Sequence, residues 1–258
     1  MTSRSILGCA LLCASLAAKA DVQTITASSL GNWTVTTSDS SVTSSFVTGP
    51  ATPPLGAGSA QFQIGPDGDS YIILRDDADI AGTPISALTQ LAYSTYQQQY
   101  LDGQAVYLSL VLSNGDRTYF EPVYQNGGYG GDSVPNQCAG VTNCAGLNQW
   151  QTWNALSGGW WDLSGFNGSN GGPPVFTLAD FAAANPDLTI SAIRLVAGGG
   201  AGAWDNFKGN ADNLTFATAS ESKTFDFEAS VPEPSALILL TIMIVGPAVL
   251  GLRKKKIV

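Results

Sequence analysis

Four tryptophans lie in one Gly- and Asn-rich stretch, residues 125–172, at Trp150, Trp153, Trp160 and Trp161. Aromatic faces stack on the apolar faces of sugar rings, and Asn, Asp and Gln side chains hydrogen-bond sugar hydroxyls. The stretch is therefore a candidate polysaccharide-binding surface. The alternative is that these side chains are core, because tryptophan is usually largely buried. Trp160 and Trp161 are adjacent, so in extended backbone they point to opposite faces and only one of the two can serve a flat platform.

Oxygen-bearing side chains cluster in residues 205–213. Calcium binds several oxygen ligands at once, and the cluster predicts a structural calcium site with Asp205 and Asp212 as ligands. The alternative is that Asp and Asn form turns here. No other cofactor is expected.

Catalytic pairs are scarce. The chain has no histidine, which excludes Ser–His and Cys–His nucleophile pairs. Of the glutamates before residue 231, Glu121, Glu221 and Glu228, no two have a spacing that marks a glycosidase acid and base. The chain is predicted not to be an enzyme, and a polysaccharide hydrolase is the weaker alternative.

Charge and cysteines point to an exported domain. Residues 21–252 hold five cations and all 20 acidic residues, a net charge of −15, which excludes nucleic-acid binding. Cys138 and Cys144 are predicted to form a disulfide in an oxidising compartment, and a metal pair is disfavoured without histidine.

The N-terminus has the pattern of a secretory signal. Residues 6–18 are an apolar run after an arginine, and Ala18 and Ala20 fit a small-x-small cleavage site. Residues 1–20 are therefore predicted to be a signal peptide. A lipoprotein signal using Cys9 is the alternative.

The last 28 residues, 231–258, combine a short polar motif, an apolar run and a basic tail. The run, residues 236–252, would span about 25 Å as a helix. The cations at 253–256 would stay on the cytoplasmic side of a membrane.

This arrangement resembles the PEP-CTERM sorting signal of exported Gram-negative proteins, with Pro232, Glu233 and Pro234 as the tripeptide and Arg253 opening the basic cluster. The resemblance implies recognition by an exosortase-type enzyme and an association with extracellular polysaccharide and biofilm. It covers only these 28 residues. An ordinary C-terminal membrane anchor is the alternative, and Pro247 inside the run is a departure that would kink the helix.

Between the two ends, alternating and β-branched segments predict strands. They cover residues 33–36, 42–47, 60–64, 71–74, 88–96, 104–112, 117–124, 188–197, 214–216 and 224–228. Asn114-Gly115 predicts a hairpin between two of them. One short helix is expected over 177–184, capped by Thr177 with Asp180 three residues later and ended by Asn185-Pro186. The stretch 125–172 is expected to be a long excursion on the rim with one or two short strands.

This pattern predicts a mainly β protein, a single antiparallel β-sandwich of jelly-roll type, over residues 21–219, with a tether at 220–230. Residues 193–216 are similar to the closing strands of carbohydrate-binding and galactose-binding-like jelly rolls, which bears on the fold more than on a ligand.

The leading functional hypothesis is an exported, non-catalytic component of an extracellular polysaccharide matrix. The second is a carbohydrate-binding module with a defined sugar site. The expected partners are the processing enzyme, extracellular polysaccharide and, through the C-terminal helix, the inner membrane of a Gram-negative bacterium. Cell surface or matrix is the expected destination.

Overall fold

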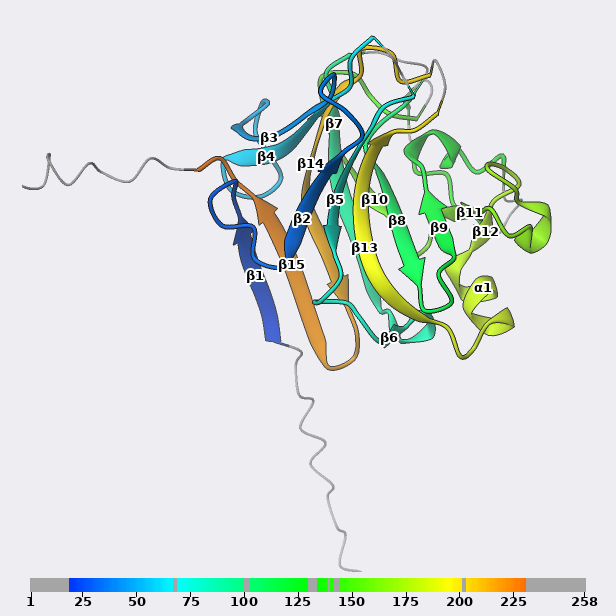
Figure 1. Ribbon diagram of the computed structural model, residues 1–258. Coiled ribbons are helices and arrows are strands. Elements are labelled where there is room, and N and C mark those ends of the chain that lie inside the picture. The colour runs from blue at the N-terminus through cyan, green and yellow to red at the C-terminus, as the bar shows by residue number, and fades with distance from the viewer. Residues whose placement is uncertain are drawn as a thin grey trace, which may run out of the picture.

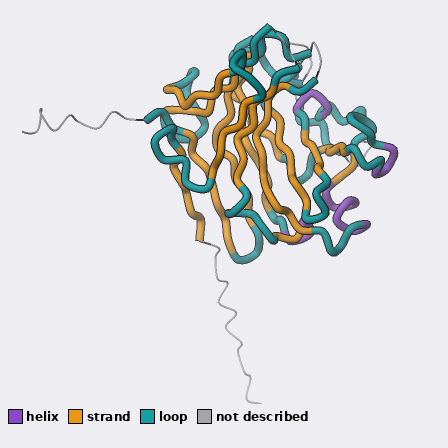
Figure 2. The backbone as a smooth tube through the Cα atoms, in the orientation of Figure 1, coloured by secondary structure: helices purple, strands orange, loops and turns teal. Residues whose placement is uncertain are grey.

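The computed structural model describes residues 19–66, 69–99, 103–129, 134–138, 140–141, 144–200 and 203–230. They form two β-sheets packed face to face, with one α-helix at the edge (Figures 1 and 2). The β-sandwich predicted from alternation is therefore confirmed. The signal peptide cleavage site at Ala18 and the sorting segment with Pro232, Glu233, Pro234 and Arg253 lie outside the residues whose side chains are described.

The first sheet has seven strands. In the order β1-β15-β14-β4-β3, with β7 on β14 and β10 on β7, they are Lys19–Ile25, Glu221–Phe227, Lys208–Ala217, Gly58–Gln63, Thr43–Thr48, Gln90–Gln97 and Trp150–Asn154. The pairing of β1 with β15 is parallel, which departs from the predicted antiparallel arrangement.

The second sheet has eight strands and forms the front layer in Figure 1. In the order β12-β11-β9-β8-β13-β5-β2, with β6 on β13, they are Phe176–Thr177, Gly159–Asp162, Arg117–Phe120, Tyr107–Leu112, Thr189–Gly198, Tyr71–Asp76, Trp33–Thr37 and Thr83–Pro84.

The strand predicted at 224–228 is confirmed, whereas the tether predicted at 220–230 is wrong. Residues 221–227 are strand β15, which pairs with β14 on one side and β1 on the other. Phe225 and Phe227 are fully buried and both pack edge-on against Trp33. This aromatic contact between the two sheets makes the last described strand an integral part of the core.

Two local predictions are confirmed. The β8–β9 hairpin turns at Asn114-Gly115, where Gly115 has a φ of 90° that favours glycine. The helix α1 runs from Leu178 to Ala184, and the Thr177 hydroxyl accepts the Asp180 N–H at 3.1 Å as an N-cap.

The excursion at 125–172 does contain two strands, but they are not confined to a rim. β10 extends the seven-stranded sheet and β11 the eight-stranded sheet. Among the described residues, no helix has the length and hydropathy needed to cross a membrane, and the predicted span at 236–252 lies outside them.

Candidate functional site

The four tryptophans do not form one platform. Trp153 and Trp160 are fully buried between the sheets, where their indole N–H groups donate to Thr95 Oγ1 at 2.8 Å and to the Ala155 carbonyl at 2.7 Å. The hypothesis that these two bind sugar is therefore wrong. Their apolar area fills the core, which is the alternative that tryptophan's usual burial favours.

Trp150 and Trp161 remain on the surface, but on different sheets. Trp150 packs against Tyr96, with ring centroids 5.5 Å apart, and its N–H donates to the Pro50 carbonyl at 2.9 Å. The loop at 49–57 thus covers it. Trp161 points away from the core, opposite to Trp160, as expected for neighbours in a strand.

Trp161 stacks on Tyr119 of β9. Their ring centroids are 4.2 Å apart and the planes differ by 15°. Trp161 is partly exposed, while Tyr119 is only 8% exposed. The pair therefore lies on the outer side of the eight-stranded sheet, and Trp161 is the more exposed of the two rings.

A single row of outward side chains runs across that sheet and ends at this stack. Its members are neighbours in strand register, from β2 through β5, β13, β8 and β9 to β11: Thr34, Arg75, Arg194, Ser109, Tyr119 and Trp161. With strands about 4.8 Å apart, the row spans roughly 24 Å. A second, parallel row includes Ile73, Val196 and Tyr107.

The sheet is hollowed over these rows. A cavity of about 450 Å³ is lined by tyrosines and arginines of β5, β8, β9 and β13, among them Tyr71, Tyr107, Tyr119, Arg75, Arg117 and Arg194. Arg117 also lines a second hollow of about 290 Å³, together with Asp116 and Leu163. Arg117 lines both hollows, and we call the two hollows together the sheet groove.

Three polar side-chain atoms in or beside the sheet groove lack partners. Ser109 Oγ, Arg194 Nε and Trp161 Nε1 are buried and make no hydrogen bond within the described part of the chain. Arg194 is only 7% exposed, and burial lowers the pKa of its guanidinium from the usual value. Of these three residues only Arg194 lines the sheet groove, whereas Ser109 and Trp161 are its neighbours in the row across the sheet. Buried polar atoms are nearly always hydrogen-bonded, so the unpaired Arg194 Nε is unusual.

Glu121 lies at the end of the same strand β9, two residues beyond Tyr119. Burial raises the pKa of its carboxyl to about 7, and no other carboxylate contributes to the shift. Glycosidases need two carboxyl groups within about 5–9.5 Å. A single raised carboxyl is not that pair, and Glu221 and Glu228 belong to or follow β15 of the other sheet.

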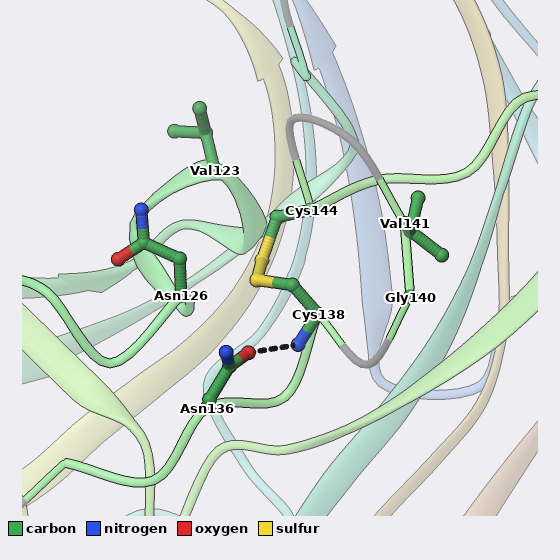
Figure 3. A pocket seen from close by; sticks show the side chains of 7 residues that line it. All are labelled: Val123, Asn126, Asn136, Cys138, Gly140, Val141 and Cys144. Carbon is green, nitrogen blue, oxygen red and sulfur yellow. Dashed lines mark hydrogen bonds between the residues drawn. A yellow bond between two sulfur atoms is a disulfide. The ribbon is translucent and has the colours of Figure 1, made fainter.

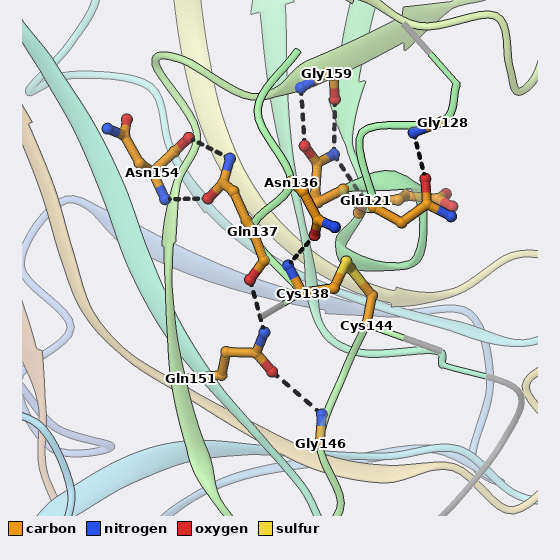
Figure 4. Close-up of a disulfide and its surroundings, with 12 residues drawn as sticks. Glu121, Gly128, Asn136, Gln137, Cys138, Cys144, Gly146, Gln151, Asn154 and Gly159 are labelled. Carbon is orange, nitrogen blue, oxygen red and sulfur yellow. Dashed lines mark hydrogen bonds between the residues drawn. A yellow bond between two sulfur atoms is a disulfide. The ribbon is translucent and has the colours of Figure 1, made fainter. Parts of the chain in front are cut away.

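The predicted disulfide between Cys138 and Cys144 is present, with a Cα–Cα distance of 4.3 Å. Figure 4 shows how glutamine side chains tie its loop to the strands. Gln137 exchanges two hydrogen bonds with the Asn154 backbone of β10, and Gln125 does the same with Gly159 of β11. The bridge thus holds a segment that links the two sheets.

A hollow of about 390 Å³ lies beside the disulfide (Figure 3). It is lined by small and neutral side chains, including Val123, Asn126, Asn136 and Val141. None of the described residues that line it is aromatic or charged, so the sheet groove is the better candidate site.

The predicted calcium ligands Asp205 and Asp212 lie in different surroundings. Asp205 is in the turn before β14, whereas Asp212 is buried within β14 and accepts N–H bonds from Leu55 and Phe227. No group of three or more acidic or thiol side chains gathers within metal-binding reach in the described ranges. Calcium binding at these two residues stays a prediction.

No protein-family model matches the chain, and no curated protein sequence matches it either. Among solved structures it is similar to the family 11 carbohydrate-binding module of a cellulosomal cellulase of Clostridium thermocellum, at 11% identity and a TM-score of 0.38, covering 74% of this chain and 89% of that one. It is also similar to a C-terminal family 22 carbohydrate-binding module of Clostridium thermocellum, at 13% identity and a TM-score of 0.36, covering 75% and 90%.

A β-1,2-glucanase from Parabacteroides distasonis is a further similar structure, at 9% identity and a TM-score of 0.35, covering 73% of this chain and 23% of that one. Likenesses this weak do not determine a ligand or an activity. The case for a function therefore rests on this chain's own side chains.

Most of the sheet groove was missed from the sequence. Tyr71, Tyr107 and Tyr119 lie within predicted strands and Arg75 directly follows one, but nothing in the sequence shows that they are neighbours. The one available signal was that Arg75, Arg117 and Arg194, three of the five cations in residues 21–252, fall within or at the end of predicted strands. Only the register of the sheet brings them together.

Proposed function

We propose that this chain is an exported, non-catalytic carbohydrate-binding domain, whose sugar site is the sheet groove. The observation that carries the proposal is the stacked pair of Tyr119 and Trp161, which ends a row of polar side chains about the length of a short oligosaccharide. Sugar rings stack on the partly exposed Trp161 ring, and the arginines that line the groove hydrogen-bond hydroxyls. This is the second functional hypothesis from the sequence. Of the four tryptophans predicted to bind sugar, the proposed site keeps only Trp161.

The test is glycan binding by the full chain and by matched tryptophan variants. Trp161→Ala is expected to weaken binding at least tenfold, because a stacked aromatic contributes about 1 kcal/mol or more beyond the area it buries. Trp150→Ala, on the outer face of the other sheet, should leave affinity unchanged. A glycan array read in parallel with affinity electrophoresis would measure both. Equal losses in the two variants, or none in Trp161→Ala, would contradict the placement of the site.

We further propose that the domain reaches the cell surface or matrix through PEP-CTERM sorting. Support comes only from residues 231–258, whose tripeptide, apolar run and basic tail occur in the order typical of that signal. In this proposal an exosortase-type enzyme recognises Pro232, Glu233 and Pro234, and the domain acts within an extracellular polysaccharide.

Substituting the sorting motif has a definite expected outcome. Glu233→Ala should leave an unprocessed precursor in the inner membrane, because the charged member of the tripeptide is lost. Ser235→Ala, just outside the tripeptide, is the matched control and should be processed normally. Intact mass and membrane fractionation in the native host measure both, and normal processing of Glu233→Ala would refute exosortase recognition.

A further inference from the structure

We propose that the sheet groove selects anionic polysaccharide, whose sugars bear carboxylate or sulfate groups, over neutral glycans. This inference rests on the proposed carbohydrate-binding function and names its ligand class. It is carried by the gathering of three arginines, Arg75, Arg117 and Arg194, around one cavity beside the aromatic stack.

The distribution of cations is strongly uneven. Residues 21–252 contain only five, against 20 acidic residues. Three of the five line the sheet groove. Of the other two, Lys223 pairs with Asp79 and Lys208 opens β14 in the opposite sheet. An acidic domain thus concentrates its positive charge on one surface, which attracts anions locally despite the overall repulsion.

The arginines are held close together by strand register. Arg75 and Arg194 are direct partners in the β5–β13 pair, and Arg117 follows on β9, two residues before Tyr119. Like charges opposite each other in a sheet are destabilising. After burial, the charges of Arg117 and Arg75 are among the causes that lower the Arg194 pKa.

The protein supplies little compensation for this charge. Arg75 Nε lies 3.5 Å from an Asp77 carboxylate oxygen, but both side chains are well exposed, and such surface pairs contribute little. Within the described ranges no ion pair joins Arg117 or Arg194 to a carboxylate. The Nε of Arg194 is also buried without a hydrogen-bond acceptor. A ligand anion would satisfy this atom and offset the repulsion.

The chemistry of the guanidinium group fits this ligand class. Its planar fork donates two parallel hydrogen bonds to a carboxylate or to a sulfate-like oxyanion, and such charge-assisted bonds are roughly twice as strong as neutral ones. The nearby stack of Tyr119 and Trp161 binds the apolar ring face of the same or the next sugar. An acidic sugar polymer therefore offers the groove both contacts, whereas a neutral polymer offers only the ring face.

The experiment compares each polymer with its own neutral form. The full chain is titrated with polygalacturonate, alginate and hyaluronan and with their carboxyl-reduced counterparts, with a sulfated galactan and its desulfated form, and with neutral glucans and xylans. Binding to at least one charged polymer is expected to be about tenfold tighter or more than to its neutral form. The carboxylate and sulfate arms identify which oxyanion is preferred.

Charge variants locate the effect. Arg117→Gln, at an exposed position, and Arg194→Gln should each reduce the ratio of the affinities for the charged and the neutral polymer towards one. Lys208→Gln removes the same charge from the other sheet and should preserve it, which separates site binding from general attraction. Melting temperatures of all variants are recorded, and Arg117→Gln keeps the test valid if Arg194→Gln does not fold.

The outcomes separate this inference from the proposed function. Equal affinity for charged and neutral forms, binding to neutral glycans alone, or a preference unchanged in the arginine variants would overturn anion selection and leave carbohydrate binding standing. Failure to bind any polymer in the panel, neutral or charged, would overturn both.

Discussion

Replacing Trp153 by alanine is expected to lower the free energy of unfolding by about 3–5 kcal/mol, the usual range for removing a large buried aromatic side chain. Trp153 is fully buried on β10, where it packs on Phe120 of the facing sheet with ring centroids 6.5 Å apart. Its indole N–H donates to Thr95 Oγ1, which would lose that partner. The substitution therefore leaves both a cavity between the sheets and an unpaired buried hydroxyl.

Far-UV circular dichroism during urea unfolding measures the loss without relying on tryptophan fluorescence. Trp161→Ala is the matched control, because the same atoms are removed from a partly exposed position, and a clearly smaller loss is expected. Comparable losses in the two variants would mean that Trp161 also contributes to the core. A loss below about 1 kcal/mol in Trp153→Ala would contradict the burial of Trp153.

Stability is expected to fall as the pH rises from about 4 to 7, chiefly because of Asp212. Burial raises the pKa of this carboxyl from 3.8 to about 7, despite the N–H bonds it accepts from Leu55 and Phe227, and the nearby Asp226 charge adds to the shift. The folded protein then binds a proton more tightly than the unfolded chain between these two values. The stability that this proton supplies is fully present below pH 4 and is lost as the pH passes the folded pKa, at up to about 1.4 kcal/mol per pH unit.

Three other carboxyls act in the same direction. Burial raises the pKa of Asp76 to about 6 and of Glu121 to about 7, and it also raises the pKa of Asp226. The Asp39 carboxyl acts in the opposite direction, because hydrogen bonds from Ser41 and Ser70 lower its pKa. The stability that it contributes is lost only as the solution becomes strongly acidic. The balance predicts a higher melting temperature at pH 5 than at pH 7.5.

Melting curves of Asp212→Asn test the assignment. Asparagine is uncharged at every pH and resembles the protonated acid, so this variant should melt with a flatter pH dependence than the parent. The control Asp187→Asn, at an exposed position, should keep the parent's pH dependence. An unaltered slope in Asp212→Asn would show that the Asp212 carboxyl does not cause the expected fall in stability between about pH 4 and 7.

Local features could be read directly from the chain. The Asn114-Gly115 hairpin, the Thr177 cap and the disulfide between Cys138 and Cys144 depend on residues close in sequence, and all three are present. Period-two alternation also identified most strands and hence the β-sandwich, because outward and inward side chains alternate whatever the partner strand is. The same rule correctly placed Trp160 and Trp161 on opposite sides.

The errors concern contacts between distant segments. The segment of the final strand β15 was predicted both as a strand and as part of a tether, because a short alternating segment near a chain end does not reveal whether neighbours lie on both sides of it. The exposure of Trp153 and Trp160 was equally undecided, because composition cannot distinguish a tryptophan that covers a loop from one that fills the space between sheets.

The sequence by itself determined a histidine-free, acidic β protein with a local disulfide, since these properties follow from residue types and short spacings. Only the tertiary structure brought together the residues of the proposed sugar site. Arg75, Arg194, Tyr119 and Trp161 come from four strands spread over nearly 120 positions, and they become neighbours through strand order and register. Register is a collective property of the sheet: it depends on which inner faces bury the core together, and no single strand carries that information.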